Sequence, residues 1–416
     1  MFIKVKVAKL INEQQGKAVM LIGIVGKANV GKSTFFKSAT LAEVLIANYP
    51  FATIKPNRAF AFIKIDCVDK ELGVQCNPRY GYCINNKRFV PVEVLDVAGL
   101  VPGAHQGKGK GNQFLDDLRQ ADAFIHIVDM AGSTNERGEP IEPGSYDPAF
   151  DIRFLEVELD MWILGIIHKG WDKFARIIQQ EKSKLSRALA KQLSGLNVTE
   201  QIVDQAIANL NLNPEKPADW TDQNLLDLAK HIRKKTKPML VVANKMDLPT
   251  AHSNLERCKK EFPDYVIIPA SGDSELALKE AAKAGLIEYS PGESKFKMSE
   301  KLNEKQKEAL TFIQKNVLDK YGSTGVQQAL DRAVLELLKY IAIFPGGVGK
   351  LGDSQGRILP DCFLLPPNST ALGFAAHIHT DLAKNFVAAI DVKTKRKISK
   401  DTPLHHRDVI EIMTSK

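Results

Sequence analysis

One segment near the start of the chain constrains the fold more than any other. Leu21–Val25 is a short apolar run typical of a buried parallel strand, and residues 26–33 directly after it match the pattern GxxxxGK[ST]. Glycines let such a loop curl, so that its N–H groups and the N-terminus of the following helix face phosphate oxygens. The segment therefore predicts a phosphate-binding loop (P-loop) in a doubly wound α/β domain.

The P-loop is expected to bind the phosphates of a nucleotide through most of its residues. Lys32 is expected to reach the β- and γ-phosphates, and the Ser33 hydroxyl is expected to ligate Mg²⁺. The residues expected to contact the nucleotide here are Lys27, Ala28, Asn29, Val30, Gly31, Lys32, Ser33 and Thr34. A glycine-rich turn rarely matches the whole pattern between a strand and a helix, so we predict a nucleotide-binding protein.

Two segments downstream supply groups for the metal and the γ-phosphate. Residues 92–95 are predicted to form a strand that ends in the sequence DVAG, whose Asp96 is placed to hold Mg²⁺ through water. The amide of Gly99, the last residue of this motif, is placed to sense the γ-phosphate. Thr53, between this motif and the P-loop, is the candidate hydroxyl that closes over Mg²⁺ in the triphosphate state. The predicted metal ligands are Ser33, Thr53 and Asp96.

A third motif predicts which base is bound. The sequence VVANKMD is an apolar strand that ends in an NKxD motif formed by Asn244, Lys245 and Asp247. Asp247 can accept hydrogen bonds from the guanine N1–H and exocyclic amine, whereas adenine would leave the carboxylate unpaired. Lys245 is expected to lie along the base and brace the P-loop. A further strand leads to Ser271 and Gly272, where a backbone N–H is expected to reach the guanine O6. Motifs in this order predict a magnesium-dependent GTPase.

The residue that activates water is not evident. Many GTPases carry a glutamine directly after the DxxG motif, but this chain has Leu100 there, so either a partner supplies a group or another residue substitutes. Asn29 is one candidate, because an asparagine at this place helps to hold K⁺ in potassium-activated GTPases. His105, in a glycine-rich segment, is another, whereas His126 is interpreted as a structural histidine inside a strand. The expected catalytic residues are Asn29, Lys32 and His105, with K⁺ as a candidate cofactor beside Mg²⁺.

Several segments together resemble the YchF subfamily of Obg-related GTPases. They are NYPFATIKPN, the run DVAGLVPGAHQGKGKGNQFLDDLRQADAFIHIVD and the C-terminal tail, and the resemblance extends from Met20 onward. It implies a GTPase domain with an inserted helical hairpin, a small C-terminal TGS domain and association with ribosomes. Several members have an altered NKxD motif and prefer ATP, but this chain keeps Asn244, Lys245 and Asp247, which favours GTP. DRG-type GTPases are the nearest alternative, although they carry DxPG where this chain has DVAG.

The chain divides into five expected parts. Residues 1–19 are an N-terminal extension, expected to be dispensable or a misassigned start, and residues 20–150 are the first part of the GTPase domain. Residues 151–236 are expected to be a helical insert, a coiled-coil hairpin, because apolar residues recur there at helical spacing. Residues 237–336 hold the second part of the GTPase domain with connecting helices. Residues 337–416 alternate short strands with helices, as in a β-grasp (TGS) domain.

Charge and hydropathy bear on the partners. The net charge of +8 permits an RNA or ribosomal partner without requiring one. The basic face of the insert is interpreted as a solvated face, with a ribosome contact as the alternative; it consists of Lys173, Lys182, Lys184, Arg187 and Lys191. Without a run of 18 apolar residues or a signal peptide, we expect a cytoplasmic protein with no membrane partner, and a monomer. The expected function is a GTP-binding and GTP-hydrolysing switch; the alternative is a nucleotide-gated RNA- or ribosome-binding scaffold with little turnover.

The five cysteines include no CxxC pair, which favours free thiols in a reducing compartment. Cys67, Cys76 and Cys83 lie close together in the sequence and could meet at a metal ion. Three ligands without a CxxC knuckle are a weak zinc signal, so inert thiols are the preferred interpretation and metal binding is the alternative.

Overall fold

The computed structural model describes residues 20–41, 57–97, 99 and 117–415. Its contacts group the chain into two compact units. The first contains Ala39–Glu93 and Leu330–Lys416, and the second contains Met20–Ser38 and Val94–Ala329. The N-terminal extension, Thr53, Leu100 and His105 lie outside the described residues. The five-part division of the chain remains a proposal.

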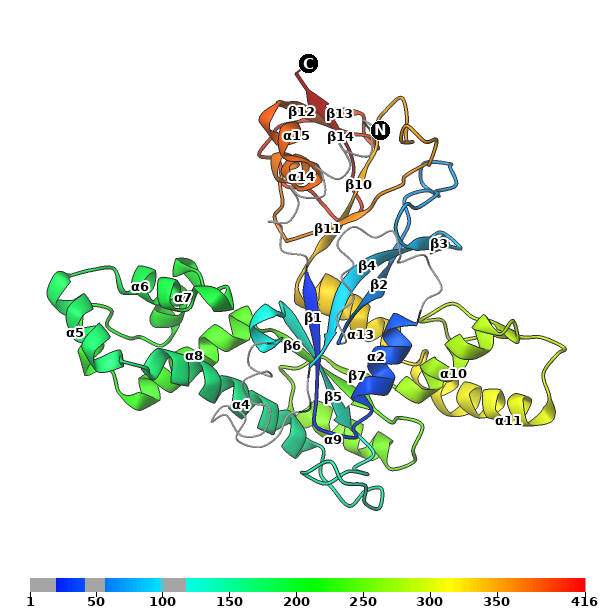
Figure 1. Cartoon of the computed structure of the whole chain (residues 1–416), viewed down its shortest axis with the longest axis horizontal. Coiled ribbons are helices and arrows are strands. Elements are labelled where there is room, and N and C mark those ends of the chain that lie inside the picture. Colours follow the sequence, from blue (N-terminus) through cyan, green and yellow to red (C-terminus); the bar gives the residue numbers. More distant parts are fainter. Residues whose placement is uncertain (1–19, 42–56, 98, 100–116, 416) are drawn as a thin grey trace. The chain divides into compact units, whose positions relative to one another are not determined.

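The second unit is built on parallel strands whose residues are almost all buried (Figure 1). They are β1 (Leu21–Val25), β5 (Ala123–Asp129), β6 (Met239–Asn244) and β7 (Ile267–Pro269), hydrogen-bonded in that order, with the end of β4 (Lys87–Asp96) next to β1. Because the strands are parallel, their carboxyl ends share one edge of the sheet, and Asp129 lies opposite Asn244 there. The predicted doubly wound sheet is confirmed, and the sequence motifs meet at this edge.

Helices flank these strands. The helix that follows the P-loop is α2 (Lys32–Thr40), and α9 (Ala251–Glu261) and α10 (Gly272–Lys283) follow β6 and β7. Beyond α10 come β8 (Ile287–Glu288), β9 (Lys297–Met298), α11 (Glu304–Ile313), the π-helical turn Gln314–Leu318, α12 (Asp319–Tyr321) and α13 (Val326–Arg332), followed by a second π-helical turn, Ala333–Leu337. The apolar side chains of α9 pack against β6, where Val241, Ala243 and Leu255 share one buried cluster.

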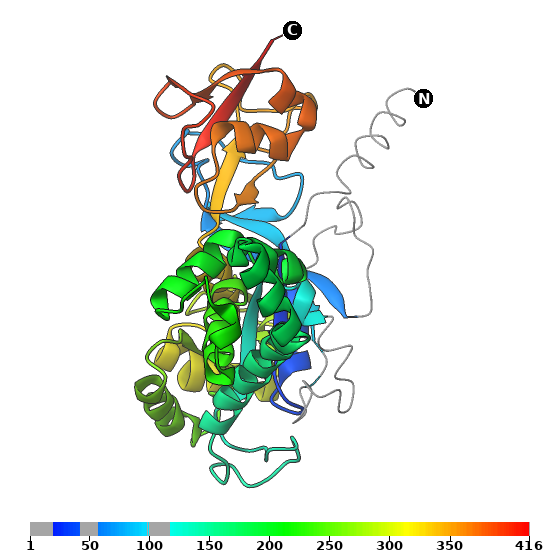
Figure 2. The ribbon, with the colours of Figure 1, turned by 90° about the vertical axis from the view of Figure 1, so that its left-hand side faces the viewer.

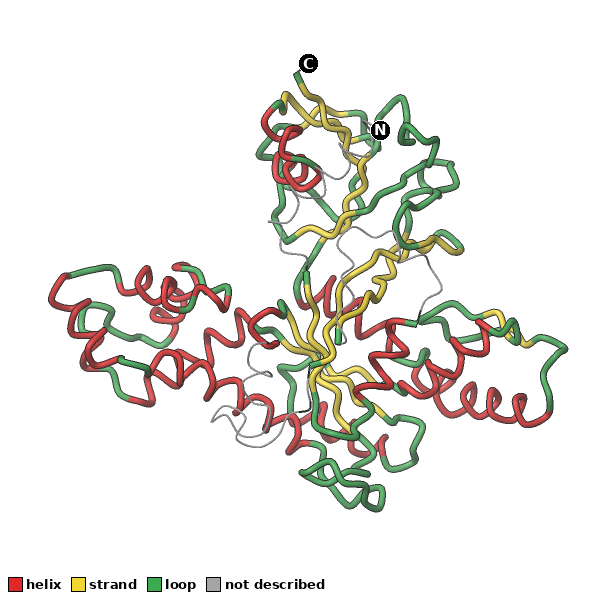
Figure 3. Tube along the Cα trace, in the orientation of Figure 1, coloured by secondary structure: helices red, strands yellow, loops and turns green. Residues whose placement is uncertain are grey.

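The insert is an antiparallel pair of helices with shorter helices at its end (Figures 2 and 3). The pair is α4 (Ala149–His168) and α8 (Asp222–Thr236), and the others are α5 (Trp171–Glu181), α6 (Leu185–Gln192), α7 (Glu200–Asn209) and the 3₁₀ turns Ser194–Leu196 and Pro217–Asp219. Most of the apolar residues that recur at helical spacing are buried, including Leu155, Leu159 and Trp162, whereas Ile177 is exposed. The arrangement is therefore a small helical domain on a two-helix stem rather than one continuous coiled coil.

The predicted basic face of the insert is partly neutralised. Lys184 Nζ lies 3.3 Å from Glu200 and 3.0 Å from Asp204, and Arg187 Nε lies 3.0 Å from Glu200. Water and salt screen exposed pairs of this kind, so they affect the surface charge more than the stability.

The first unit contains the predicted β-grasp domain. Its sheet has the order β11 (Phe363–Leu365), β10 (Ile341–Pro345), β14 (Val409–Thr414), β12 (Phe386–Asp391) and β13 (Arg396–Ile398). The central pair β10–β14 is parallel and the other pairs are antiparallel, and α14 (Ala371–Ile378) and α15 (Thr380–Lys384) lie between β11 and β12 in the sequence. Phe374 of α14 fills the core beneath this sheet.

The same unit holds a second set of strands, β2 (Arg58–Asp66), β3 (Tyr82–Ile84) and the first part of β4. β3 and β4 form an antiparallel hairpin in which Cys83 lies opposite Arg88. Its two-residue turn, Asn85 and Asn86, has positive φ at both positions (51° and 58°), as the favoured hairpin turn requires. Among the described helices, none is long and apolar enough to span a membrane.

Candidate functional site

The P-loop lies between the end of β1 and the start of α2. Its backbone is left-handed at Asn29 (φ 60°) and Gly31 (φ 89°), and Gly31 accepts the first helical hydrogen bond from Phe35 N at 2.9 Å. A Cβ atom on Gly31 would lie 2.2 Å from Asn244 Nδ2, so a side chain is excluded by space as well as by conformation. The loop is therefore tightly curled at the N-terminus of α2, the kind of position at which phosphate groups bind.

The side chain of Lys27 points away from the predicted phosphates into the protein. Its Nζ lies 2.8 Å from Asp151 Oδ2, donates to the Thr134 carbonyl at 3.2 Å and lies 3.9 Å from the centre of the Tyr146 ring. Lys27 can thus serve a nucleotide only through its backbone. The sequence motif did not predict this buried ion pair, because the partner is 124 residues away.

Asn29 also reaches outside the loop. Its Nδ2 donates to the Gly138 carbonyl at 2.9 Å. Gly138 has φ 80°, and a Cβ there would meet the Ala28 carbonyl oxygen at 2.6 Å. The turn around Gly138 therefore packs directly on the P-loop and holds the Asn29 amide. The sequence offered only one signal for this contact, a glycine within a polar turn.

Of the predicted metal ligands, Asp96 lies beside the P-loop lysine. Lys32 Nζ lies 3.5 Å from Asp96 Oδ1, which is buried and accepts no hydrogen bond from any described residue. Lys32 and Asp96 are the groups expected to contact the β- and γ-phosphates and Mg²⁺. A buried carboxylate oxygen without a hydrogen-bond donor fits a hydrated Mg²⁺ ion, which prefers oxygen ligands and keeps several waters. Ser33, the second predicted ligand described by the structure, is exposed. Gly99 lies beside the P-loop, because a Cβ on it would be in ordinary contact with Ala28 N at 3.7 Å.

Asn244 connects the phosphate site to the base site. Its Nδ2 donates to the Val30 carbonyl at 2.8 Å, and its Oδ1 accepts from Gly272 N at 3.0 Å. The side chain is buried at the end of β6, so both hydrogen bonds are shielded from water. Asn244 thus positions the P-loop relative to the turn at Ser271 and is a positioning residue.

Lys245 has a left-handed backbone (φ 63°) that turns its side chain back over the edge of the sheet. Its Nζ lies 3.1 Å from Asp129 Oδ2 and 2.9 Å from Ser133 Oγ. The buried Asp129 also accepts from Ser133 and Thr134, so the carboxylate that anchors Lys245 is itself fixed. Asp129 and Ser133 are site residues that the sequence motifs did not include; the strand ending in aspartate beside the NKxD strand was the available signal.

Asp247 and Ser271 form the candidate guanine-recognition group. The Ser271 hydroxyl donates to Asp247 Oδ1 at 2.8 Å, and Ser271 also caps α10 by accepting from Ser274 N. Its own N–H donates to the Thr324 carbonyl at 3.0 Å, and the Gly272 N–H donates to Asn244 Oδ1 at 3.0 Å, so both backbone N–H groups that were expected to reach the guanine O6 already have an acceptor within the chain. The Thr324 carbonyl lies in a turn where Gly325 (φ 80°) approaches the Pro269 carbonyl so closely that a Cβ would be 2.0 Å away. This turn, also unpredicted, fixes Ser271 and so the orientation of Asp247.

His126 lies inside β5 and is buried. Burial lowers its pKa to about 3, and the positive charge of Lys27 acts in the same direction. It is therefore neutral at physiological pH, as expected of a structural histidine. The roles expected of Asn29, Lys32, His105 and Thr53 remain predictions.

Family models match most of the chain. A model described as a 50S ribosome-binding GTPase matches residues 21–148, one described as an Obg-like GTPase YGR210-like, G4 motif-containing domain matches residues 242–347, and a TGS domain model matches residues 353–414. Together they cover the P-loop, the NKxD motif and the β-grasp domain. The helical insert lies between the first two matched segments, in residues 149–241.

Individual proteins agree with these models. An uncharacterized GTP-binding protein of Methanocaldococcus jannaschii is 50% identical over 95% of this chain and 99% of its own length. The ribosome-binding ATPase YchF of Bacillus subtilis is 30% identical over 61% of this chain and 66% of its own length. A crystal structure of a GTP-binding protein from Pyrococcus horikoshii OT3 is 40% identical, covers 95% of this chain and 100% of its own, and superposes with a TM-score of 0.76.

Proposed function

Because the chain belongs to the YchF subfamily of Obg-related P-loop GTPases, we propose that it hydrolyses GTP to GDP and phosphate and works as a nucleotide-dependent switch. GTP is the proposed substrate although relatives include proteins named ATPases. One observation carries this choice. Asp247 is the carboxylate of the NKxD motif and can accept hydrogen bonds from both the N1–H and the exocyclic amine of guanine. The Ser271 hydroxyl donates to Asp247 Oδ1 at 2.8 Å and so holds this carboxylate in place.

The choice of base can be tested by exchanging one atom of the recognition group. Asp247→Asn replaces a carboxylate oxygen by an NH₂ donor, which repels the guanine amine but complements the C2 carbonyl of xanthine. GTP affinity is expected to fall roughly 5- to 150-fold and XTP affinity to rise, since an unpaired polar group costs about 1–3 kcal/mol. Asp273→Asn, the same change at an exposed position of α10, is the matched control. Equal affinity of the wild-type chain for ATP and GTP would overturn the proposal.

Hydrolysis is assigned to the groups around Lys32 and Asp96. When bound, Mg²⁺ would neutralise phosphate charge, with Ser33, Asp96 and Thr53 as the proposed ligands. Lys32 withdraws charge from the β- and γ-phosphates, and the N-terminus of α2 stabilises the phosphate oxygens. Asn244, which donates to the Val30 carbonyl, holds the P-loop in position relative to the base site. Single-turnover GTP hydrolysis is expected to be lost in Ser33→Ala. Unchanged turnover in that variant, or none in the wild-type chain, would favour the nucleotide-gated scaffold.

K⁺ is the proposed auxiliary cation at Asn29. With Nδ2 donating to Gly138, the amide Oδ1 of Asn29 is the atom left to ligate a cation. Turnover in KCl should exceed turnover in NaCl at equal ionic strength, and Asn29→Ala should abolish the difference. Equal rates of hydrolysis by the wild-type chain in both salts would refute the K⁺ assignment. His105 would then be the remaining residue of this chain that is a candidate for activating water.

The ribosome is the proposed partner, on the strength of the family description and of the name of the Bacillus subtilis relative. Co-sedimentation with purified ribosomes at physiological salt, with a non-hydrolysable GTP analogue or with GDP, tests this together with the switch. Binding that needs the triphosphate supports both. If the chain binds ribosomes in neither state, the ribosome is rejected as its partner. The proposal of GTP hydrolysis would then depend only on the measured rate of hydrolysis.

A further inference from the structure

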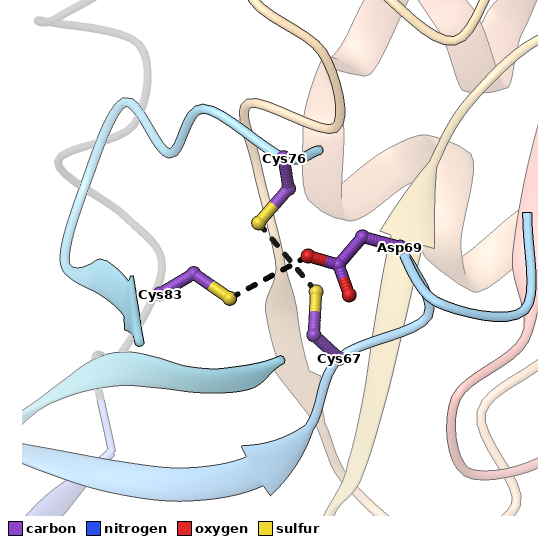
Figure 4. A group of neighbouring side chains, drawn as sticks. All are labelled: Cys67, Asp69, Cys76 and Cys83. Carbon is purple, nitrogen blue, oxygen red and sulfur yellow. Dashed lines mark hydrogen bonds between the residues drawn. The ribbon is translucent and has the colours of Figure 1, made fainter. Parts of the chain in front are cut away.

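Three cysteines and one aspartate meet in the first unit, and none of them belongs to the candidate nucleotide site. Cys67 directly follows β2, Asp69 and Cys76 lie in the segment after it, and Cys83 lies on β3 (Figure 4). Their ligand atoms, three sulfurs and a carboxylate oxygen, all lie within 4.8 Å of one another. We infer that Cys67, Asp69, Cys76 and Cys83 form a structural Zn²⁺ site.

The distances in this cluster fit tetrahedral coordination. Zn–S bonds of about 2.3 Å and Zn–O bonds of about 2.0 Å at tetrahedral angles place two sulfurs about 3.8 Å apart and a sulfur and an oxygen about 3.5 Å apart. The Sγ atoms of Cys67 and Cys76 are 3.6 Å apart, and Cys83 Sγ is 3.7 Å from Asp69 Oδ2. One ion in the middle would therefore reach the ligands with small adjustments of the side chains.

Asp69 is the strongest sign that a cation belongs there. The exposed fraction of Asp69 is 0%. No lysine or arginine side chain of the described residues forms an ion pair with its carboxylate, which accepts only from Lys70 N, Asn86 Nδ2 and the Cys83 thiol. Buried carboxylates are normally paired with a cation or coordinate a metal, since removing the charge from water is costly. The thiols of the cluster are weak donors and do not balance that charge.

The surrounding hydrogen bonds orient the carboxylate. Asp69 Oδ1 accepts from Lys70 N at 2.7 Å and from Asn86 Nδ2 at 3.1 Å, while Oδ2 faces the sulfur of Cys83. Hydrogen bonds to ligand atoms of this kind fix ligand orientation in metal sites. The turn residue Asn86 thus ties the hairpin to the proposed centre, and its carbonyl also accepts from Cys67 N at 2.8 Å.

A buried cation lies on the same side of the hairpin. Arg88 is opposite Cys83 in the register and is 1% exposed. Its two terminal nitrogens donate to the carbonyls of Leu359 and Pro360 at 3.0 and 2.9 Å. Three thiolates and a carboxylate around Zn²⁺ would carry a net charge of −2, and Arg88 offsets part of it.

The segment that carries these ligands lacks regular secondary structure, so a bound ion would stabilise it. Between the end of β2 and the start of β3 the segment 67–81 contains turns but no helix or strand. It contacts the C-terminal part of the same unit, where Asn77 N donates to the Ile358 carbonyl and Arg79 N to the Pro360 carbonyl, both at 2.8 Å. A four-coordinate zinc ion would close this loop and stabilise its contacts, as closed structural zinc sites do.

Zn²⁺ is preferred to harder cations because three of the four ligands are thiolates, which bind soft or borderline metals. Each thiol that binds would release its proton to solvent. Cys362, partly buried and close enough to Cys67 and Cys76 to interact with them electrostatically, is not in the group of mutually close ligands. It is the alternative to Asp69 as the fourth ligand.

The first experiment is elemental analysis of the full chain, expressed in zinc-supplemented medium, freed of any affinity tag and purified without chelator. About one zinc per chain is expected. After chelation, titration with Co²⁺ should give the intense absorption of tetrahedral cobalt with thiolate ligands. No zinc together with no cobalt absorption would overturn the site, and so would a Cys67–Cys76 disulfide in the freshly purified, unreduced protein, detected by peptide mapping.

Variants then assign the ligands. Cys76→Ser and Cys83→Ser should lose the metal and unfold at lower temperature, whereas Cys258→Ser, a buried cysteine of the other unit, should keep it. Asp69→Ala should change the cobalt spectrum and Cys362→Ser should not; the reverse result would replace Asp69 by Cys362. If the serine variants do not fold, the wild-type zinc content and cobalt spectrum still decide the question.

Discussion

The buried ion pair between Lys27 and Asp151 makes a quantitative prediction about the P-loop. The two side chains are 4% and 7% exposed, with Nζ 2.8 Å from Oδ2. Lys27 has two further partners, the Thr134 carbonyl and the Tyr146 ring, and the Tyr146 hydroxyl donates to Asp151 Oδ1 at 3.0 Å. Asp151→Ala would leave an ammonium group in the protein interior with only a carbonyl and a ring to stabilise it.

The magnitude follows from that burial. Removing one partner of a buried pair costs about 3–5 kcal/mol. The remaining cation–π contact, worth about 2 kcal/mol when desolvated, places the loss near the lower end of that range. Burial raises the pKa of Asp151 above its ordinary value even though Lys27 opposes the shift, so desolvation outweighs the attraction between the two charges. The double variant Lys27→Met/Asp151→Leu should therefore be close to the wild-type chain in stability.

Scanning calorimetry of the nucleotide-free chain can measure this. For a unit of this size 1 kcal/mol corresponds to about 2–4 °C, so Asp151→Ala should lower the unfolding temperature by roughly 6–12 °C. Glu256→Ala, which breaks the exposed pair with Lys259 on α9, should lower it by about 2 °C or less. A loss in Asp151→Ala no larger than in this control would refute the reasoning, as would a double variant as unstable as the single one.

Three other variants test the site. Asn244→Ala leaves the Val30 carbonyl and the Gly272 amide unpaired, so GTP affinity measured by calorimetry should fall by about 2–4 kcal/mol; a loss below threefold would contradict the bridging role. Gly31→Ala should nearly abolish nucleotide binding in the same assay, because of its φ of 89° and the 2.2 Å approach of Asn244 Nδ2. The pKa of His126 is about 3 in the folded chain against 6.5 ordinarily, so the unfolded state takes up the proton first and stability falls with decreasing pH; between pH 6.5 and 5 the wild-type chain should lose about 1.6 kcal/mol more than His126→Phe in denaturant titrations, and parallel pH profiles would contradict this.

The sequence alone predicted the parts of the fold that depend on local chemistry. A P-loop needs glycines at positions of unusual backbone conformation, so Gly31 and its neighbours are enough to identify the phosphate site. The NKxD motif and the β-grasp domain were predicted for the same reason, because strand patterns and turn residues are set by neighbours in the chain. The apolar spacing of α4 likewise predicted which of its residues are buried.

Only the tertiary structure decided which distant groups meet. Lys27 reads in the sequence as part of a phosphate loop, yet its side chain is held by Asp151 in the interior. Lys245 is anchored by Asp129, 116 residues away. Cys67 and Cys83 carry only a weak metal signal in the sequence, and it is the folded chain that brings Asp69 between them. Spacing in the sequence describes local conformation, whereas contacts over such distances follow from how strands and helices pack, and packing is a property of the whole chain.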